Sequence, residues 1–232
     1  MPVTSAQVPA RARENGSEVR VPELVSAIEF DILFGRLKPR ERLIEDALML
    51  RFGAKRHAVR RALDELVKLG VVVRAPSRGA TVRDFSAQEV EEVYELRELL
   101  QGHAVRRMPL PVPKGHIERL EEIQKQHDLA VDAADLRLVD RINDEFHRVF
   151  FSVCGSKLLC DAITQYMQLT RAMRVYPIAE PQTLAKLRDE HWAMIRALEV
   201  GDRTELLHLC SQHLQPSKAA YLAVRRSIPD TE

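Results

Sequence analysis

The chain has 232 residues, of which 45% are hydrophobic and 30% are charged, a profile typical of a soluble globular protein with one large or two small domains. No uninterrupted apolar run approaches the roughly 20 residues that cross a bilayer, and the N-terminus lacks the apolar core of a secretory signal. The three cysteines form no recognised motif, so we expect no disulfide framework and a cytoplasmic location.

Charge is divided unevenly along the chain, although the net charge is only +1. Residues 21–85 hold 13 Lys and Arg against 9 Asp and Glu, whereas residues 86–232 hold 19 against 23. A basic first part and an acidic second part predict two domains with different roles. Residues 1–20 are expected to form a flexible tail, and its arginines could act as an arm that touches DNA.

The basic part begins with three predicted helices. Apolar residues at helical spacing place these helices at 22–35, 45–51 and 55–69. A tight turn at Gly53 between the second and third helices is typical of a helix-turn-helix. After Gly70 the pattern becomes β-branched and predicts two strands joined by a turn at residues 76–79. Helices followed by a small hairpin predict a winged helix.

Basic side chains crowd the first half of the third predicted helix. In a helix-turn-helix this half reaches the base edges in the major groove, where arginine pairs with guanine and lysine neutralises phosphate. A solvated basic face is common on surface helices, but the layout of helices and wing favours DNA. The interpretation would fail if Arg56 and Arg60 lay against the protein's own carboxylates, turned away from solvent. The candidate DNA contacts are Lys55, Arg56, His57, Arg60, Arg61, Arg78 and Gly79.

Several motifs in this part resemble GntR-type transcription regulators. That family usually carries a run like FGVSRTPVREAL, and residues 52–63 here read FGAKRHAVRRAL. Other matching segments are 35–39, 42–43 and 76–80. The resemblance implies a winged helix in which Arg56 and Arg60 contact DNA. Because His57, Ala58 and Arg61 depart from the usual Thr, Pro and Glu of this run, the family's preferred half-site does not carry over.

From Ser86 onward the pattern is helical. Ser86 is a plausible N-cap, and Glu89 three residues later completes a capping box. Further helices are expected at 114–133, 136–153 and 157–175, followed by a loop at 177–181 and two final helices. We therefore predict a mainly α protein, in which an N-terminal winged helix-turn-helix precedes an all-α bundle of six or seven helices.

Motifs in the bundle resemble the FCD ligand-sensing domain of the FadR subgroup of GntR regulators. They are Val93–Arg97, Phe146-His147, Glu190-His191, Ala197-Leu198, Gly201-Asp202 and His213. Many FCD domains hold a metal with one Asp and three His, which map here onto Asn143, His147, His191 and His213. The first two of these four residues share a helix face at i and i+4, and imidazole suits Zn²⁺ and Ni²⁺. Asn143 stands where the family has aspartate, which should weaken the site and leave it more electropositive.

The resemblance also implies an effector and a mode of action. A metal with open positions beside arginine attracts a carboxylate, so we expect a small organic acid to bind near Arg97, Arg171 and Arg174. The expected function is a homodimeric repressor whose recognition helices bind the half-sites of a near-palindromic operator. Effector binding would move the joint around residues 83–90 and release double-stranded DNA. We assign structural roles to His103, His116, His127 and His208.

Two alternatives belong to other classes of protein. Three histidines around a metal also describe metal-dependent hydrolases, although the sequence has no HExxH motif and no clear general base. An interaction protein with a degenerate DNA-binding domain is the other alternative. DNA binding with a steep salt dependence would separate the regulator from both, and we do not expect an enzyme.

Overall fold

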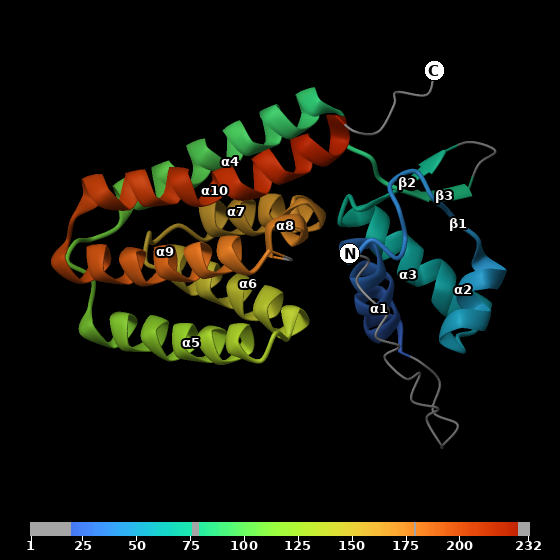
Figure 1. The fold of residues 1–232 in the computed structure, drawn as a ribbon, viewed down its shortest axis with the longest axis horizontal. Helices are drawn as coiled ribbons and strands as arrows, with labels where there is room; N and C mark the ends of the chain where they lie inside the picture. Colours follow the sequence, from blue (N-terminus) through green and yellow to red (C-terminus); the bar gives the residue numbers. More distant parts are fainter. Residues whose placement is uncertain (1–19, 76–78, 179, 227–232) are drawn as a thin grey trace.

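The computed structural model describes residues 20–75, 79–178 and 180–226, which form a smaller and a larger lobe (Figure 1). The tail predicted at 1–20 lies almost wholly outside the described residues. The smaller lobe contains α1 (Val21–Leu33), β1 (Arg42–Leu43), α2 (Glu45–Phe52), α3 (Arg56–Lys68), β2 (Val72–Ala75) and β3 (Gly79–Val82). This order of helices and strands confirms the predicted winged helix-turn-helix.

The wing is an antiparallel sheet with the strand order β1-β3-β2. Val72 pairs with Val82 and Ala75 with Gly79, so β2 and β3 form the expected hairpin. The sequence analysis did not predict β1, which pairs Arg42 with Thr81. A strand of two residues shows no alternation in the sequence, so only the pairing with β3 defines it.

The core of the smaller lobe lies between α1 and α3. Leu24 and Ile28 on α1 and Val59, Leu63 and Leu66 on α3 are almost completely buried. These positions recur at helical spacing, so burying one face of α3 leaves its basic residues on the opposite face. Gly53 ends α2 in the left-handed conformation, with φ of 62°, and begins the tight turn into α3.

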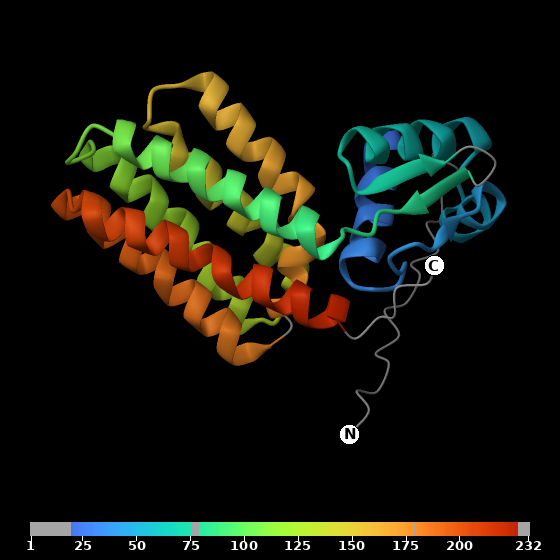
Figure 2. The same cartoon turned by 90° about the horizontal axis from the view of Figure 1, so that it is seen from above.

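The larger lobe is a bundle of seven helices among the residues that the structure describes. They are α4 (Ala87–Arg107), α5 (Lys114–Asp132), α6 (Leu136–Ser152), α7 (Lys157–Leu169), α8 (Arg171–Ile178), α9 (Pro181–Val200) and α10 (Arg203–Arg226). The predicted capping box is present at the start of α4, since the side chains of Ser86 and Glu89 each accept from the other's backbone N–H. α4 packs along α10, α10 along α9, and α5 against both α9 and α6 (Figures 1 and 2). None of the described helices is long and apolar enough to cross a membrane.

The helix predicted at 157–175 was wrong in one respect, because the structure divides it at Thr170. The hydroxyl of Thr170 donates to the carbonyl of Tyr166 at 2.8 Å, a back-bond that commonly bends helices. The same hydroxyl accepts from Arg97 Nη1 at 3.0 Å, which holds the bend against α4. The separate helix α8 lies at the end of the bundle that faces the smaller lobe (Figure 1).

The turn after α3 packs closely against the bundle. Gly70 has φ of 75°, and a Cβ at this position would lie 2.6 Å from Leu169 Cδ1. We expect Gly70→Ala to lower the free energy of unfolding by about 1–2 kcal/mol, because a left-handed backbone is strained for alanine. Urea denaturation measures the difference. Gly115→Ala is the control, since a Cβ there meets nothing within 4 Å. Equal losses in the two variants would contradict the strain at Gly70.

Candidate metal centre and DNA-contacting surface

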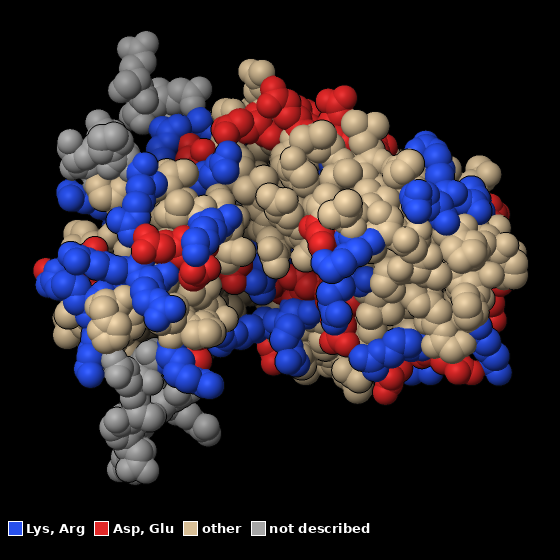
Figure 3. All heavy atoms as spheres, turned by 180° about the vertical axis from the view of Figure 1, so that it is seen from behind, with Lys and Arg blue, Asp and Glu red and all other residues tan. Residues whose placement is uncertain are grey.

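The recognition helix α3 exposes the basic residues singled out in the sequence. The side chains of Lys55, Arg56, His57, Arg60 and Arg61 are all exposed. Gly79 is also exposed and begins β3 with φ of 72°, whereas Arg78 lies outside the described residues. On the face seen in Figure 3, Lys and Arg side chains are dense over the smaller lobe, and much of the larger lobe carries no charge.

Two of these arginines contact carboxylates at the start of α2. Arg56 lies 2.6 Å from Asp46, and Arg60 lies 3.0 Å from Glu45. The two arginine side chains nevertheless remain 50% and 58% exposed. Exposed ion pairs contribute about 0–1 kcal/mol, so both guanidinium groups can exchange a carboxylate for a phosphate or a base. The DNA interpretation would fail if Arg56 and Arg60 both contacted carboxylates and were turned away from solvent. They do contact carboxylates, but they are exposed, so the interpretation stands.

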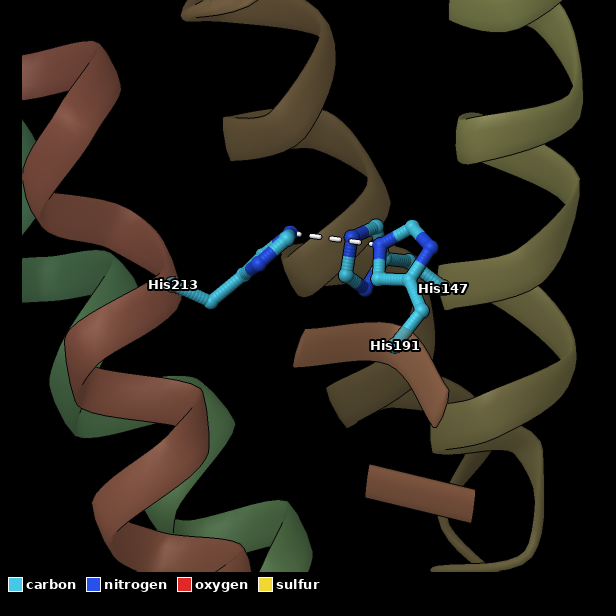
Figure 4. A group of neighbouring side chains, drawn as sticks. All are labelled: His147, His191 and His213. Carbon is cyan, nitrogen blue, oxygen red and sulfur yellow. Dashed lines mark hydrogen bonds between the residues drawn. The ribbon is translucent and has the colours of Figure 1, made fainter. Parts of the chain in front are cut away.

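Three histidines from three helices converge in the core of the bundle (Figure 4). His147 lies on α6, His191 on α9 and His213 on α10. One ring nitrogen from each lies within 4.8 Å of the other two, and the Nε2 atoms of His191 and His213 are 3.3 Å apart. The structure therefore brings together the three imidazoles that the sequence predicted as metal ligands.

The partners of His191 determine which of its nitrogens carries the proton. Gln124 donates from Nε2 to the carboxylate of Asp128 at 2.9 Å, so its Oε1 is the atom that faces His191. This oxygen lies 2.9 Å from His191 Nδ1 and can only accept, which places the proton on Nδ1 and leaves a lone pair on Nε2. Trp192 donates to the other oxygen of Asp128 at 3.0 Å and holds that carboxylate in place.

His213 is held in a similar way. Its Nδ1 lies 2.7 Å from Glu190 Oε2 and donates to it, so its Nε2 also faces the cluster. With both Nδ1 atoms protonated, neutral rings would direct two lone pairs at each other across 3.3 Å. A cation between them removes this repulsion, and hydrogen bonds of this kind to the outer nitrogen are typical of metal-ligating histidines.

Burial keeps the imidazoles of His147 and His191 neutral. His147 is 6% exposed and His191 is 1% exposed. Desolvation lowers the pKa of both rings well below the usual value, and the nearby His213 lowers it further. Neutral imidazole is the form that binds a metal. His147 Nδ1 is buried and has no hydrogen-bond partner among the described residues, so the three rings fit a metal ion.

The wall of the surrounding cavity includes the fourth predicted ligand. The cavity has a volume of about 40 Å³, and half-buried Asn143 lines it together with Asp140. Asp144, the next residue along the helix from Asn143, instead contacts Arg174 at 2.7 Å. The amide oxygen of Asn143 can coordinate a cation but brings no negative charge. The site therefore offers only neutral ligands where the site that FCD domains usually have includes a charged aspartate.

Two of the three predicted effector arginines line the same cavity. Arg97 and Arg174 are 4% and 8% exposed. Burial lowers the pKa of Arg97 to about 10. Arg97 Nε and Arg174 Nε and Nη1 are buried without a hydrogen-bond partner in the described part of the chain. Such N–H groups are costly to leave unpaired and fit an anionic ligand.

Arg171, the third predicted effector residue, does not line the cavity. Its side chain bridges Asp140 on α6 and Glu29 on α1, with distances of 2.7 Å and 2.6 Å. Arg171 therefore faces the smaller lobe, whereas Arg174, three residues later on α8, lines the cavity. The structure thus separates two residues that the sequence analysis had grouped.

The sequence analysis missed several residues around the cluster. Asp140 lies three residues before Asn143 and seven before His147, so its helical spacing could have placed it on the same face. His127 was assigned a structural role, yet it lines the cavity, and burial lowers its pKa to about 4. Gln124 and Glu190 were not assigned a role at the cluster, because the rings that they contact, His191 and His213, lie on other helices.

A winged helix-turn-helix joined to a helical bundle with a histidine-lined cavity is the architecture of a DNA-binding regulator. Residues 21–82 match the model of "Bacterial regulatory proteins, gntR family", and residues 92–216 match the FCD domain. The chain belongs to the GntR family of bacterial transcription regulators and carries a C-terminal FCD domain.

Relatives and solved structures span nearly the whole chain. The transcriptional repressor RspR of Escherichia coli K12 is 23% identical over 86% of this chain and 88% of its own length. The regulator McbR of the same strain is 22% identical over 83% and 88%. The solved structure of E. coli McbR/YncC has a TM-score of 0.68 at 21% identity, covering 88% of this chain and 98% of that one. A GntR regulator from Rhodococcus sp. RHA1 reaches 0.70 at 19% identity, covering 88% and 97%. These likenesses support regulation of transcription and give no support to the hydrolase alternative.

Proposed function

We propose that the protein is a homodimeric repressor of the FadR subfamily that releases its operator when a small organic acid binds beside a metal in the bundle. The observation that carries this proposal is the pairing of three converging imidazoles with two buried arginines that have unpaired N–H groups. A metal and a carboxylate together would satisfy both sets of atoms. The names of RspR and of the E. coli repressor GlaR, which is 25% identical, agree with repression.

In this proposal the two parts of the chain have separate roles. Residues 21–85 bind double-stranded DNA, and residues 86–232 bind the effector and form the dimer. Arg56 and Arg60 read base edges, and the surrounding basic residues hold the phosphates. Lys55, His57, Arg61, Arg78 and Gly79 complete the proposed DNA contacts.

The proposed metal is Zn²⁺ or Ni²⁺, held by His147, His191 and His213 with the amide oxygen of Asn143. When bound, the ion supplies a Lewis acid with open positions for a carboxylate. Arg97 and Arg174 orient that carboxylate through their unpaired N–H groups and exclude neutral ligands. Because Asn143 brings no charge, the anionic effector would itself balance part of the charge of the ion.

The proposed dimer uses an exposed apolar face of the bundle. Leu99 on α4 and Leu158 on α7 are 59% and 83% exposed, and their helices pack against each other. On the larger lobe in Figure 3 a broad area carries no charge, which suits a second copy of the same surface. We expect Leu99→Asp combined with Leu158→Asp to weaken the dimer at least about tenfold, as measured by sedimentation equilibrium. The control is Leu129→Asp, because Leu129 is 69% exposed on α5. A dimer unchanged by the double substitution would exclude this face.

Two measurements test the proposed function. First, the protein is used to select sequences from a random DNA pool, and the affinity for the selected site is measured against salt. We expect a steep loss of affinity with salt, because each neutralised phosphate releases counterions. Second, elemental analysis should find one divalent ion per chain, and carboxylates should raise the melting temperature. A protein without metal that no Zn²⁺ or Ni²⁺ stabilises, or a ligand screen in which only neutral or cationic compounds bind, would refute the effector site.

A further inference from the structure

The short helix α8 carries one arginine toward the cavity and another toward the smaller lobe. Arg174 lines the cavity, and Arg171, three residues earlier, holds Glu29 of α1 at 2.6 Å. Ala172 between them packs against the core of the smaller lobe. α8 therefore touches both the proposed effector site and the DNA-binding lobe, and a shift of this helix reaches both.

Acidic residues on α6 link the two arginines. Asp144 contacts Arg174 at 2.7 Å and also lies 3.8 Å from Arg171. Asp140 contacts Nη2 of Arg171 at 2.5 Å in addition to Nε. It lines both the cavity and a cleft of about 470 Å³ between α1 and α6. The result is a continuous row of alternating charges from the cavity to α1, largely shielded from solvent. In such surroundings a change of partner at one end is felt by the next pair.

We propose that α8 couples the effector site to the winged helix through competition for Arg171. An anion that pairs with Nε and Nη1 of Arg174 draws the guanidinium group toward itself, and the contact of Nη2 with Asp144 weakens. Asp144 then competes with Glu29 for Arg171, and the ion pair between the lobes weakens. The two recognition helices lose their fixed spacing, and affinity for the operator falls. This inference rests on the proposed function, because it takes the ligand of the cavity to be an anion.

The balance of charge supports this direction. Arg171 and Arg174 face three acids, namely Glu29, Asp140 and Asp144, so the row already has an excess of negative charge. Burial raises the pKa of Glu29, and Asp140 and Asp144 raise it further, although Arg171 opposes the shift. Further negative charge in the cavity makes ionised Glu29 still less favourable, and Glu29 is the member of the row that belongs to the other lobe.

The coupling can be tested without any ligand. Arg174→Gln frees Asp144 in the way that the effector would, and hydrogen exchange of the backbone amides of α1 reports the state of the joint. We expect α1 to exchange about tenfold faster in this variant and in Glu29→Gln, the amount expected from losing a charged hydrogen bond. Combining the two substitutions should add nothing further, because both act on the same ion pair.

The rescue experiment separates coupling from general destabilisation. Adding Asp144→Asn to Arg174→Gln removes the competitor of Glu29 and should return α1 to the exchange rate of the parent. Asp144→Asn alone should leave the joint closed. Arg119→Gln is the control, because Arg119 is an exposed, ion-paired arginine of α5. Normal exchange of α1 in Arg174→Gln, or fast exchange that Asp144→Asn does not reverse, would overturn the proposal. Metal content and carboxylate binding are measured separately, so a failure of the proposed function is recognised independently.

Discussion

Replacing Arg56 and Arg60 by alanine is expected to abolish sequence-specific DNA binding and to leave the fold intact. Each arginine that pairs with a base is worth about 1–3 kcal/mol of discrimination, so each single variant should lose roughly 5- to 150-fold in affinity for its selected site. The ion pairs with Glu45 and Asp46 do not change this expectation. They contribute at most about 1 kcal/mol each, less than a base contact provides.

The two effects should not simply add. Arg56 and Arg60 lie one turn apart on α3, and both contact Glu45. Affinity is measured by fluorescence anisotropy at physiological salt, and circular dichroism checks the fold. Arg119→Ala is the matched control, since it removes an equally exposed arginine from the bundle. If the double variant kept its affinity for the selected site, α3 would not be the recognition helix.

Replacing His213 by alanine should remove the metal. A bound ion would lose one of three imidazoles, and we expect its affinity to fall by more than about 100-fold, since losing an outer-shell partner alone costs 10- to 100-fold. Glu190→Gln should have that smaller effect, because Glu190 orients the ring of His213 through Nδ1. Titration calorimetry with Zn²⁺ measures both, and the ion should no longer raise the melting temperature of His213→Ala.

His208→Ala is the control for this experiment. His208 lies on α10 like His213, but it is exposed and does not line the cavity. The alanine variant of His213 also removes the hydrogen-bond donor to Glu190 Oε2, which lowers stability for a reason unrelated to metal. Metal affinity is therefore the deciding quantity, and unchanged Zn²⁺ binding by His213→Ala would exclude the cluster as the metal site.

Local patterns predicted the elements of this fold well. The stripe of Val59, Leu63 and Leu66 identified α3, and the capping box at Ser86 identified the start of α4. The break at Thr170 escaped prediction, because the surrounding residues have ordinary helical spacing and the hydroxyl acts through contacts with other turns and with Arg97 on α4. The strand β1 escaped for a similar reason, since pairing with β3 alone defines it.

The candidate site was predictable where its residues follow one another along a helix. Asn143 and His147 are spaced one turn apart, and the resemblance to FCD domains supplied His191 and His213. The contacts of Glu190 with His213 and of Gln124 with His191 were not predictable, because only the packing of separate helices forms them. Arg171 and Arg174 are three residues apart, so the helical pattern grouped them, and only contacts with Asp140 and with Glu29 of the smaller lobe distinguish Arg171.

The hydrogen bond from Trp192 to Asp128 has a practical consequence. The sequence contains a single tryptophan, and two further hydrogen bonds connect its partner to a ring of the histidine cluster. Indole emission depends on the polarity and charge around the ring. The tryptophan emission of the unlabelled protein therefore comes from Trp192 alone, which Asp128 and Gln124 connect to the ring of His191. It offers an optical signal for titrating the histidine cluster.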